Sequence, residues 1–193
     1  LVHLGYNRLC VAHVAEAIDL IEVGVRATFL VLSAALPENS EDIVAYDCEP
    51  VVCTLDMVEA LAYAAARAGK RVAVHLKVDT GMGRIGIRPD EVPTFLAQCR
   101  AFPAVTVRGI MSHFPLAPEA DTSFTRQQVA LFRCVQDATR AYGITSYHLA
   151  NSAAIFDLPE ALCDAARPGI AIYGLRPSSM IANPRVHDLK PVL

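Results

Sequence analysis

One stretch of the chain, residues 75–87, places charged side chains beside closely spaced glycines in the sequence HLKVDTGMGRIGI. Lys77, Asp79 and Arg84 put three charges next to a turn, and the glycines allow the backbone there to adopt a positive φ or to approach a ligand closely. A plainer interpretation is that Asp79 caps the turn while Lys77 and Arg84 are solvated surface charges. The position of Lys77 helps to decide between the two.

Lys77 lies inside an apolar run, residues 72–78, that we predict to be a buried strand. Strand interiors seldom carry lysine. A buried lysine needs a partner or a modification that offsets the cost of removing its charge from water, which is several kcal/mol per ion. We therefore expect residues 75–87 to form part of a functional site.

The composition of the chain excludes several classes of protein. It has 193 residues, 53% of them hydrophobic, and a net charge of −3, which suits one compact domain with a sizeable core. Its 17 basic and 20 acidic residues include no basic run, and aromatic residues make up only 7%, so we expect no nucleic-acid partner. No window of about 18 uncharged apolar residues predicts a membrane span.

The chain begins with LVHLGYNR, which has neither an initiator methionine nor the features of a signal peptide. We therefore expect a fragment of a longer, cytoplasmic protein, whose true N-terminus could carry a targeting signal. The six cysteines show no metal-ligand spacing, so we predict no metal site and mostly small core residues in a reducing compartment. The alternative is a disulfide between Cys48 and Cys53, the only close pair.

Apolar runs and turn residues predict seven strands that alternate with helices. The predicted strands span residues 8–12, 28–32, 49–54, 72–78, 105–111, 146–150 and 170–173. The predicted helices span residues 14–23, 57–68, 89–99 and about 122–142, with short helices after the second and sixth strands. This alternation predicts an α/β fold with a parallel sheet and right-handed crossovers.

Both a doubly wound sheet and a barrel accommodate seven strands. The candidate functional residues lie beside the ends of several different strands, most of them just after a strand. Sites built in this way are typical of (β/α)8 barrels, in which the loops after the strands meet on one face, whereas a doubly wound sheet has a single crevice. We therefore predict an incomplete (β/α)8 TIM-type barrel, one strand short of eight.

Two later segments supply further candidates. Ser152 opens a helix after the sixth strand and Gly169 exposes backbone N–H groups, so together they could bind a phosphate. The alternative is an ordinary N-cap serine and a turn glycine. Arg167 could likewise be an ion-pair partner, and His113 a core histidine. The other histidines receive only that structural interpretation: His3, His13, His75, His148 and His187.

Five segments in order along the chain resemble the alanine racemases, enzymes that use pyridoxal 5'-phosphate. They are HLKVDTGMGRIGI, MSHF, the spacing of Phe124, Gln128 and Phe132, LANSAA and ARPGIAIYGLRPS, all within residues 9–178. A single motif can match by chance, but the probability that five motifs match by chance in the same order is negligible in comparison. The resemblance implies a barrel domain without its first βα unit, residues 1–179, and a linker, residues 180–193, towards an absent C-terminal β-domain.

The resemblance also implies roles for single residues. Arg84 matches the arginine that contacts the substrate carboxylate and the cofactor phenolic oxygen. Lys77, with Asp79 beside it, matches the lysine that is carbamylated in some members and supports that arginine. The implied cofactor contacts are His113 near the pyridine ring, Arg167 at the pyridine nitrogen, Ser152 and the backbone amides of Gly169 and Ile170 at the phosphate, and Asn151 in the same cluster.

The contact implied for Arg167 has a chemical consequence. A guanidinium hardly ever gives up its proton, so the pyridine nitrogen would stay largely unprotonated and the cofactor would be a weaker electron sink. This suits removal and return of a proton better than decarboxylation or transamination.

Two groups that the family uses for catalysis are absent from the chain. No segment resembles KANAYGHG, which carries the lysine of the internal aldimine, and Lys70 and Lys190 do not match it. The catalytic tyrosine, which comes from the C-terminal domain of the partner subunit, is absent too. Because racemisation by two bases needs a group on each face of the substrate, we expect this chain alone to be inactive.

We therefore expect the parent protein to be a homodimer that interconverts L-alanine and D-alanine and supplies D-alanine for peptidoglycan. One alternative is a serine or broad-specificity amino-acid racemase, because the substrate pocket depends partly on the missing domain. The other is a non-catalytic remnant that binds pyridoxal phosphate. A lysine upstream and a tyrosine downstream in the parent would distinguish an enzyme from a remnant.

Overall fold

The computed structural model describes residues 1–117 and 121–192 and contains a seven-stranded sheet. The strands lie side by side in chain order, and each pairs in parallel with the next. Their bounds are β1 Arg8–Val11, β2 Thr28–Ala34, β3 Glu49–Val52, β4 Val72–Lys77, β5 Val105–Met111, β6 Ser146–Asn151 and β7 Ala165–Arg167.

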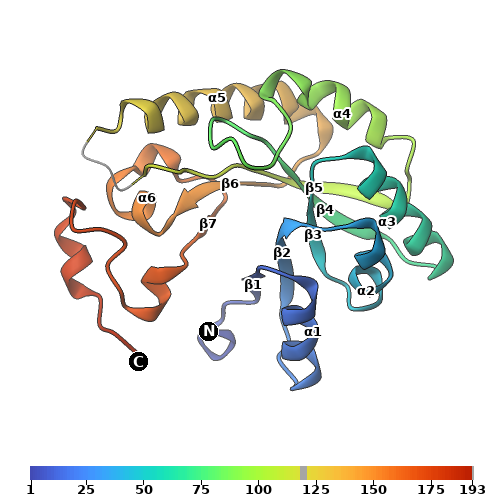
Figure 1. The fold of residues 1–193 in the computed structure, drawn as a ribbon, viewed down its shortest axis with the longest axis horizontal. Coiled ribbons are helices and arrows are strands. Elements are labelled where there is room, and N and C mark those ends of the chain that lie inside the picture. The colour runs from blue at the N-terminus through green and yellow to red at the C-terminus, as the bar shows by residue number, and fades with distance from the viewer. Residues whose placement is uncertain (118–120, 193) are drawn as a thin grey trace.

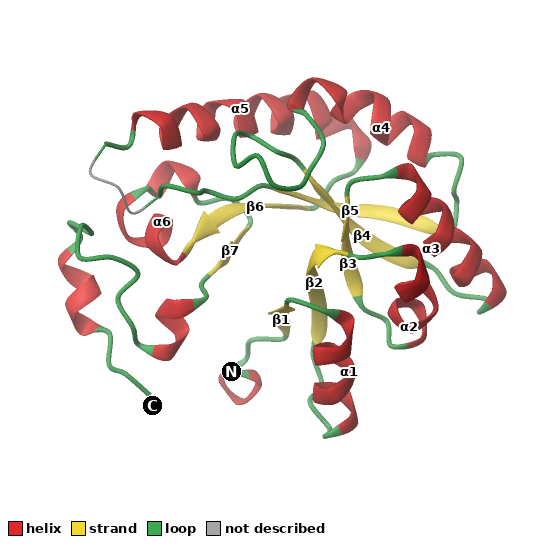
Figure 2. Ribbon diagram, in the orientation of Figure 1, coloured by secondary structure: helices red, strands yellow, loops and turns green. Residues whose placement is uncertain are grey.

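Helices follow the strands and cover the outer side of the sheet (Figure 1). The α-helices are α1 Val14–Glu22, α2 Ser40–Ala45, α3 Leu55–Arg67, α4 Val92–Cys99, α5 Ser123–Thr139 and α6 Ser152–Asp157. The 3-10 helices are Val2–Leu4, Pro37–Asn39, Pro89–Glu91, Arg140–Tyr142, Pro159–Ala161, Ile170–Tyr173 and Pro184–Asp188. The sheet curves around a common interior and stays open between β1 and β7 (Figure 2). This is an incomplete (β/α)8 TIM-type barrel, as the sequence predicts.

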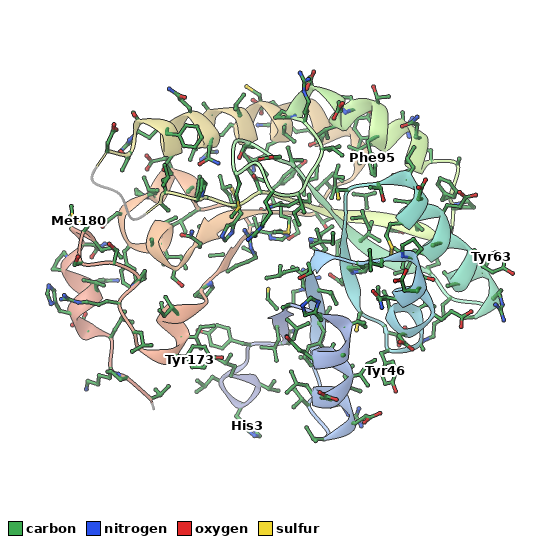
Figure 3. The ribbon with its side chains drawn as sticks, in the orientation of Figure 1. His3, Tyr46, Tyr63, Phe95, Tyr173 and Met180 are labelled. Atoms are coloured by element: carbon green, nitrogen blue, oxygen red, sulfur yellow. The ribbon has the colours of Figure 1, made fainter. Side chains whose placement is uncertain are left out.

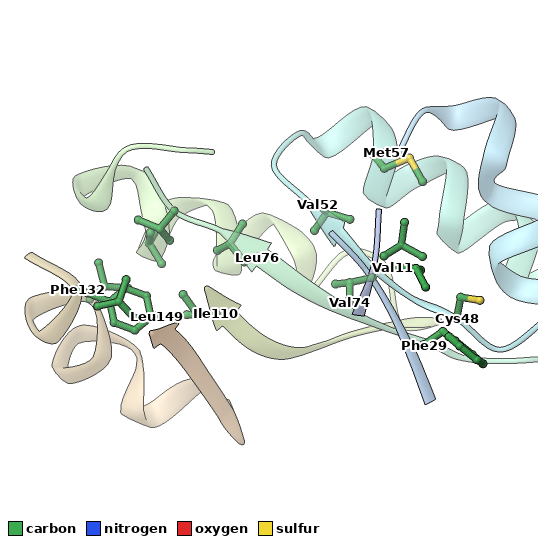
Figure 4. Close-up of a cluster of buried hydrophobic side chains, with 14 of the residues drawn as sticks. Val11, Phe29, Cys48, Val52, Met57, Val74, Leu76, Ile110, Phe132 and Leu149 are labelled. Atoms are coloured by element: carbon green, nitrogen blue, oxygen red, sulfur yellow. The ribbon is translucent and has the colours of Figure 1, made fainter. Parts of the chain in front are cut away.

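The hydrophobic core lies between the strands and the helices. Ile110 and Leu149 lie beside Phe132 of α5, and Leu76 follows on the next strand (Figure 4); each is at most 1% exposed. Successive side chains of a strand point to opposite faces, so the neighbours of Leu76 face the barrel interior. Packing of the apolar residues against the helices therefore fixes which polar residues point inward.

The seventh strand differs from the prediction. The apolar run Ile170–Tyr173 forms a 3-10 helix, and β7 lies just before it at Ala165–Arg167. Pro168 cannot donate a ladder hydrogen bond, and Gly169 has a φ of −100° and a ψ of −91°, so the extended backbone ends there. The run is also not buried: Tyr173, 53% exposed, lies on the side where the barrel is open (Figure 3).

The segment after the barrel motifs packs against α6. The Asp157 carboxylate accepts hydrogen bonds from the backbone amides of Ala182 and Asn183, at 2.8 and 2.9 Å. Ile181 and Val186 are buried in the same region. In the part of the chain that the structure describes, no helix is long and apolar enough to cross a membrane.

The cysteines are all free thiols, so the alternative of a disulfide between Cys48 and Cys53 is wrong. Cys48 and Cys99 are buried, as expected for small core residues, and Cys48 contributes to the cluster in Figure 4. Cys10 and Cys134 are exposed, so the core interpretation does not extend to them.

Candidate functional site

The polar residues singled out in the sequence meet at the carboxyl ends of β4 to β7. There they surround a cavity of about 450 Å³. The candidates that line it are Lys77, Arg84, His113, Asn151, Ser152, Arg167, Gly169 and Ile170, together with apolar residues such as Leu32, Ile85 and Met111. Asp79 is the one candidate that is not part of its lining. Because parallel strands end on the same face of a barrel, residues far apart in sequence form one site.

The charge of this cavity is one-sided. Its charged lining residues are Lys77, Arg84 and Arg167, and the lining includes no aspartate or glutamate. His113 responds to this charge: burial, and then the three cations, lower its pKa to about 4. The imidazole is therefore neutral near pH 7. A cavity of this kind favours an anionic ligand and disfavours a cationic one.

Lys77 is buried, with 3% of its surface exposed, so the interpretation as a solvated surface charge is wrong for this residue. Burial lowers the pKa of its ammonium group to about 7, and the charges of Arg167 and Arg84 add to the shift. Neither a hydrogen bond nor an ion pair to the Lys77 ammonium is found among residues 1–117 and 121–192. A large fraction of this amine is therefore uncharged near neutral pH.

Arg84 lies exposed in the glycine-containing loop, at the edge of the cavity. It has no carboxylate partner within the described part of the chain. No hydrogen bond links it to Lys77 either, and as two cations the side chains repel each other. Its guanidinium is therefore available to an anionic ligand.

Asp79 organises the loop that carries Arg84. Its carboxylate accepts hydrogen bonds from the backbone amides of Gly81, Met82 and Gly83, at 2.9, 2.7 and 2.9 Å. Gly81 and Gly83 have φ values of 135° and 70°, the conformations expected from their spacing. The plainer interpretation, that Asp79 caps the turn, is thus confirmed.

Gly86 closes the loop by letting it return to the end of β4. The Asp79 amide donates to the Ile87 carbonyl at 2.8 Å, and the Ile87 amide donates to the Lys77 carbonyl at 3.0 Å. A Cβ atom on Gly86 would lie 2.7 Å from the Asp79 amide nitrogen, closer than real Cβ contacts allow. A side chain at this position would therefore push the loop away from Lys77.

Helix α5 holds the loops after β4 and β5 together. The Gln128 side chain donates to the hydroxyl oxygen of Thr80 at 3.5 Å and to the carbonyl of His113 at 3.4 Å. Phe124 packs so closely on Gly81 that a Cβ there would lie 2.9 Å from its ring. The spacing of Phe124, Gln128 and Phe132 places the three side chains on one face of the helix, and the first two contact the loops.

Arg167 ends β7 and points into the barrel. One terminal nitrogen donates to Nδ1 and to the carbonyl of His148, at 2.6 and 2.8 Å. The other donates to the carbonyls of Ser112 and Leu149, at 2.6 and 3.3 Å. Burial lowers the Arg167 pKa to about 10, so the group stays charged at neutral pH. None of these partners is a carboxylate, which contradicts the interpretation of Arg167 as an ordinary ion-pair partner.

The guanidinium of Arg167 has five N–H donors, and these contacts account for the four on the terminal nitrogens. The fifth, on Nε, has no acceptor among the described residues. Because Arg167 also lines the cavity, this donor remains for a ligand.

Ser152 and Gly169 form direct contacts with each other. The Ser152 hydroxyl oxygen accepts the amides of Gly169 and Ala171 at 2.8 and 3.4 Å. The cap of α6 is Asn151, whose side-chain oxygen accepts the Ala154 amide at 3.1 Å, so the alternative of Ser152 as the N-cap is wrong. The Ser152 hydroxyl can therefore donate its proton to a ligand.

Ile170 is the first residue of a 3-10 helix, where a backbone N–H has no partner within the helix. The Gly169 amide, by contrast, is not free as the sequence suggested, because it donates to Ser152.

The sequence interpretation missed a series of buried, hydrogen-bonded side chains that begins at Arg167. His148 contacts His75, from Nε2 to Nδ1, at 2.8 Å, and His75 contacts the Glu49 carboxylate at 3.0 Å. His75 and His148 are not isolated core histidines, since each has polar partners on both ring nitrogens. Only His75 carried a signal like that of Lys77, because it is a polar residue within the same apolar strand, whereas Glu49 stands at the start of β3.

The described parts of the chain, residues 1–117 and 121–192, contain no group of three histidine, cysteine or acidic side chains that could hold a metal ion.

The seven parallel strands and the cavity at their carboxyl ends define the class of protein as an incomplete TIM-barrel domain. The model of the alanine racemase N-terminal domain matches residues 1–177, and the chain belongs to this family. Over 181 residues it is 41% identical to the alanine racemase of Desulforamulus reducens, covering 92% of this chain and 49% of the relative. It is 40% identical to that of Halothermothrix orenii, covering 100% and 51%.

Solved structures agree with this assignment. Alanine racemase of Clostridium difficile 630 in complex with cycloserine matches with a TM-score of 0.91 and 30% identity, over 96% of this chain and 51% of that one. The enzyme from Bacillus anthracis with bound L-Ala-P matches with a TM-score of 0.85 and 32% identity, over 96% and 48%. The chain thus spans about half the length of the relatives it matches.

The role of Asp79 in the loop predicts a pH-dependent stability difference. Burial alone would raise its pKa, but the amides of Gly81, Gly83 and Met82, with Lys77, hold that pKa below its ordinary value. The full stabilising contribution of the Asp79 charge is therefore present above a pH of about 4, and it is lost as the pH falls through the lowered pKa of Asp79. At pH 7 we expect Asp79→Asn to lower the free energy of unfolding by about 1 kcal/mol in urea titrations.

The difference between wild type and Asp79→Asn should shrink in acid, towards the lowest pH at which the protein stays folded. Asp90→Asn, which removes an exposed carboxylate paired with Arg88, is the matched control and should change stability little. A difference for Asp79→Asn that does not vary with pH would contradict the capping role of its charge.

Proposed function

We propose that the natural protein carrying this chain is a pyridoxal-phosphate-dependent alanine racemase. In this proposal the chain provides the cofactor contacts and the contact to the substrate carboxylate. The observation that carries it is the cavity at the strand ends, which is lined by Lys77, Arg84 and Arg167 and by no carboxylate. Membership of the alanine racemase N-terminal domain family supports it independently.

Pyridoxal phosphate fits the chemistry of this cavity. Its phosphate is an anion and its pyridine nitrogen is a hydrogen-bond acceptor, and the volume of about 450 Å³ lies within the range for small-molecule sites. The Ser152 hydroxyl and the amide of Ile170 would donate to the phosphate, with Gly169 and Asn151 beside them. Nε of Arg167 would donate to the pyridine nitrogen, and His113 would lie near the ring. When bound, the cofactor withdraws electrons from the substrate Cα and so makes its proton easier to remove.

Arg167 would limit how far that withdrawal goes. Its pKa of about 10 keeps the guanidinium protonated at neutral pH, so the group donates a hydrogen bond and does not hand a proton to the ring. Its four other donors are fixed by His148, Ser112 and Leu149, which holds the guanidinium in place. This arrangement favours removal and return of the Cα proton.

Arg84 would bind the carboxylate of alanine. A guanidinium without a carboxylate partner of its own is suited to a bidentate pair with this group. The loop that holds Arg84 is fixed by Asp79 and Gly86, which gives the guanidinium a defined position at the cavity edge. Asp79 thus supports the substrate contact indirectly.

Lys77 would support Arg84 as a carbamate. The uncharged amine adds to the carbon of carbon dioxide and loses one proton to solvent, which leaves a carbamate anion; the pKa of about 7 makes the uncharged amine abundant. Carbamylation would replace an amine that is only partly cationic by an anion near Arg84 and Arg167, and so give these two arginines an attractive partner.

This modification can be tested with ¹³C-bicarbonate at about pH 8, where most of the Lys77 amine is uncharged given its lowered pKa. We expect a carbamate signal in the ¹³C NMR spectrum of the natural protein that disappears in Lys77→Met. Lys70→Met is the control, because Lys70 is held by Asp47 and two carbonyls near the surface, and it should keep the signal. A spectrum without a Lys77-dependent signal would contradict the carbamate.

The groups that move protons would come from outside this chain. We propose a lysine from a segment before it and a tyrosine from a C-terminal β-domain of a partner subunit, in a cytoplasmic homodimer that supplies D-alanine for peptidoglycan. That the chain spans about half of its relatives is consistent with this. Residues 1–179 would then form the barrel domain, and residues 180–193 the linker.

The activity test uses the natural protein with added pyridoxal phosphate and follows D-alanine formation from L-alanine. We expect Arg84→Ala to lower kcat/KM on the order of 100-fold, because a charge-assisted pair to the carboxylate is lost. Arg88→Ala removes a nearby exposed arginine paired with Asp90 and should leave the rate unchanged.

L-serine serves as a parallel substrate in this assay. Faster turnover of serine than of alanine would show that the assignment of alanine as the substrate is wrong, and would favour a serine or broad-specificity racemase. A protein that binds the cofactor but racemises neither amino acid would contradict the racemase proposal and leave a binding role.

A further inference from the structure

A second, smaller cavity of about 80 Å³ lies inside the barrel, beside the series of hydrogen-bonded side chains that begins at Arg167. Its lining includes the four hydrogen-bonded side chains of this series, Glu49, His75, His148 and Arg167. These residues come from β3, β4, β6 and β7, so the series crosses the barrel interior. Its contacts measure 3.0 Å from Glu49 to His75, 2.8 Å from His75 to His148 and 2.6 Å from His148 to Arg167.

Arg167 and Glu49, at the two ends of this series of hydrogen-bonded side chains, determine the direction of every hydrogen bond in it. A guanidinium only donates, so Nδ1 of His148 must accept from Arg167. The proton of neutral His148 is then on Nε2 and is donated to Nδ1 of His75. The proton of neutral His75 is in turn on Nε2 and is donated to Glu49, whose ionised carboxylate only accepts. Both histidines are therefore Nε2–H tautomers.

The surroundings support both the charges and the close packing. Arg8 and Arg108 pair with the other carboxylate oxygen of Glu49, and the pKa of Glu49 is lowered below its ordinary value even though burial opposes the shift. Burial, and then the charge of Arg167, lowers the pKa of His148 to about 2, so its ring is neutral.

Gly109, which pairs with His75 on the neighbouring strand β5, leaves room for the His75 ring, because a Cβ atom there would lie 2.2 Å from Nδ1 of His75. The series therefore has one defined hydrogen-bonded state.

We infer that Glu49 is a positioning residue for Arg167. By accepting the proton of His75, the Glu49 carboxylate fixes the tautomers of both histidines and presents the unprotonated Nδ1 of His148 to the guanidinium. Reversal of the series would place a His148 N–H against an Arg167 N–H at 2.6 Å, two donors without an acceptor. Glu49 thus helps to keep the Arg167 terminal nitrogens engaged, so that Nε is the donor left without an acceptor among the described residues.

The tautomers can be measured directly in the natural protein without cofactor. We expect long-range ¹H–¹⁵N NMR spectra of ¹⁵N-histidine-labelled protein to show His75 and His148 as neutral Nε2–H tautomers at neutral pH, with signals assigned by replacing one histidine at a time. A charged ring or an Nδ1–H tautomer at either position would overturn the inference. This measurement needs no change at Glu49, and it does not depend on racemase activity.

Glu49→Gln tests the role of the carboxylate itself. An amide offers both an N–H donor and a carbonyl acceptor to His75, so only the Arg167 end still favours the original direction of the hydrogen bonds. In a reversed network Arg167 would lose Nδ1 of His148 and keep the His148 carbonyl. We expect a mixed tautomer signal for His148 and a shifted Nε–H signal for Arg167. Glu41→Gln is the matched control, because Glu41 pairs with Arg67 at the surface, and it should change neither signal.

The consequence for catalysis rests on the proposed function. We expect kcat for alanine to fall about tenfold in Glu49→Gln with little change in KM, the scale on which lost outer partners of a site act. Unchanged His148 and Arg167 signals in a folded Glu49→Gln protein would overturn the positioning role. Absent activity in the wild type would count against the proposed function alone, because the NMR result does not use turnover.

Discussion

The structure depends on uncompensated positive charge at the carboxyl ends of β4 to β7. Lys77, Arg84 and Arg167 line one cavity without a carboxylate among its lining residues, although the chain has more acidic than basic residues. Burying Lys77 and Arg167 near each other, with the exposed Arg84 at the cavity edge, costs free energy unless an anion joins them. The lowered pKa values of Lys77 and His113 reflect this cost. An anionic cofactor, an anionic substrate and a carbamate would each compensate part of that charge.

Several local features serve to hold these cations in place. Arg167 is held by backbone carbonyls and by a neutral histidine, which orient it without cancelling its charge. Asp79 is used for the amides of its own loop, and Gly86 lets that loop close on β4. The one buried carboxylate of the interior network, Glu49, is separated from Arg167 by two imidazoles. The barrel therefore fixes the cations while it keeps acidic groups out of the ligand cavity.

The sequence predicted those parts of the fold and site that depend on local signals. Apolar runs with helical segments between them located the first six strands, and a lysine in an apolar strand indicated the site at Lys77. The seventh strand was misplaced because residues 170–173 are as apolar as a strand, while Pro168 and Gly169 end the extended backbone before them.

The partners of His75 and His148 could not be predicted in the same way. His148 is 73 residues from His75, and Glu49 is 26 residues from it, so only the barrel brings them together. The same holds for the cap of α6. Asn151 and Ser152 are adjacent, and both residue types are good N-caps. The folded structure uses the Asn151 side chain as the cap and places the Ser152 hydroxyl against the Gly169 amide, which the sequence does not show.

The most direct test of the account is a crystal structure of the natural protein grown with pyridoxal phosphate. The account predicts the phosphate within hydrogen-bond distance of the Ser152 hydroxyl and the Ile170 amide, and the pyridine nitrogen opposite Nε of Arg167. Arg84 should be left free to bind a carboxylate. A phosphate held by Arg84, or a pyridine nitrogen directed away from Arg167, would contradict it.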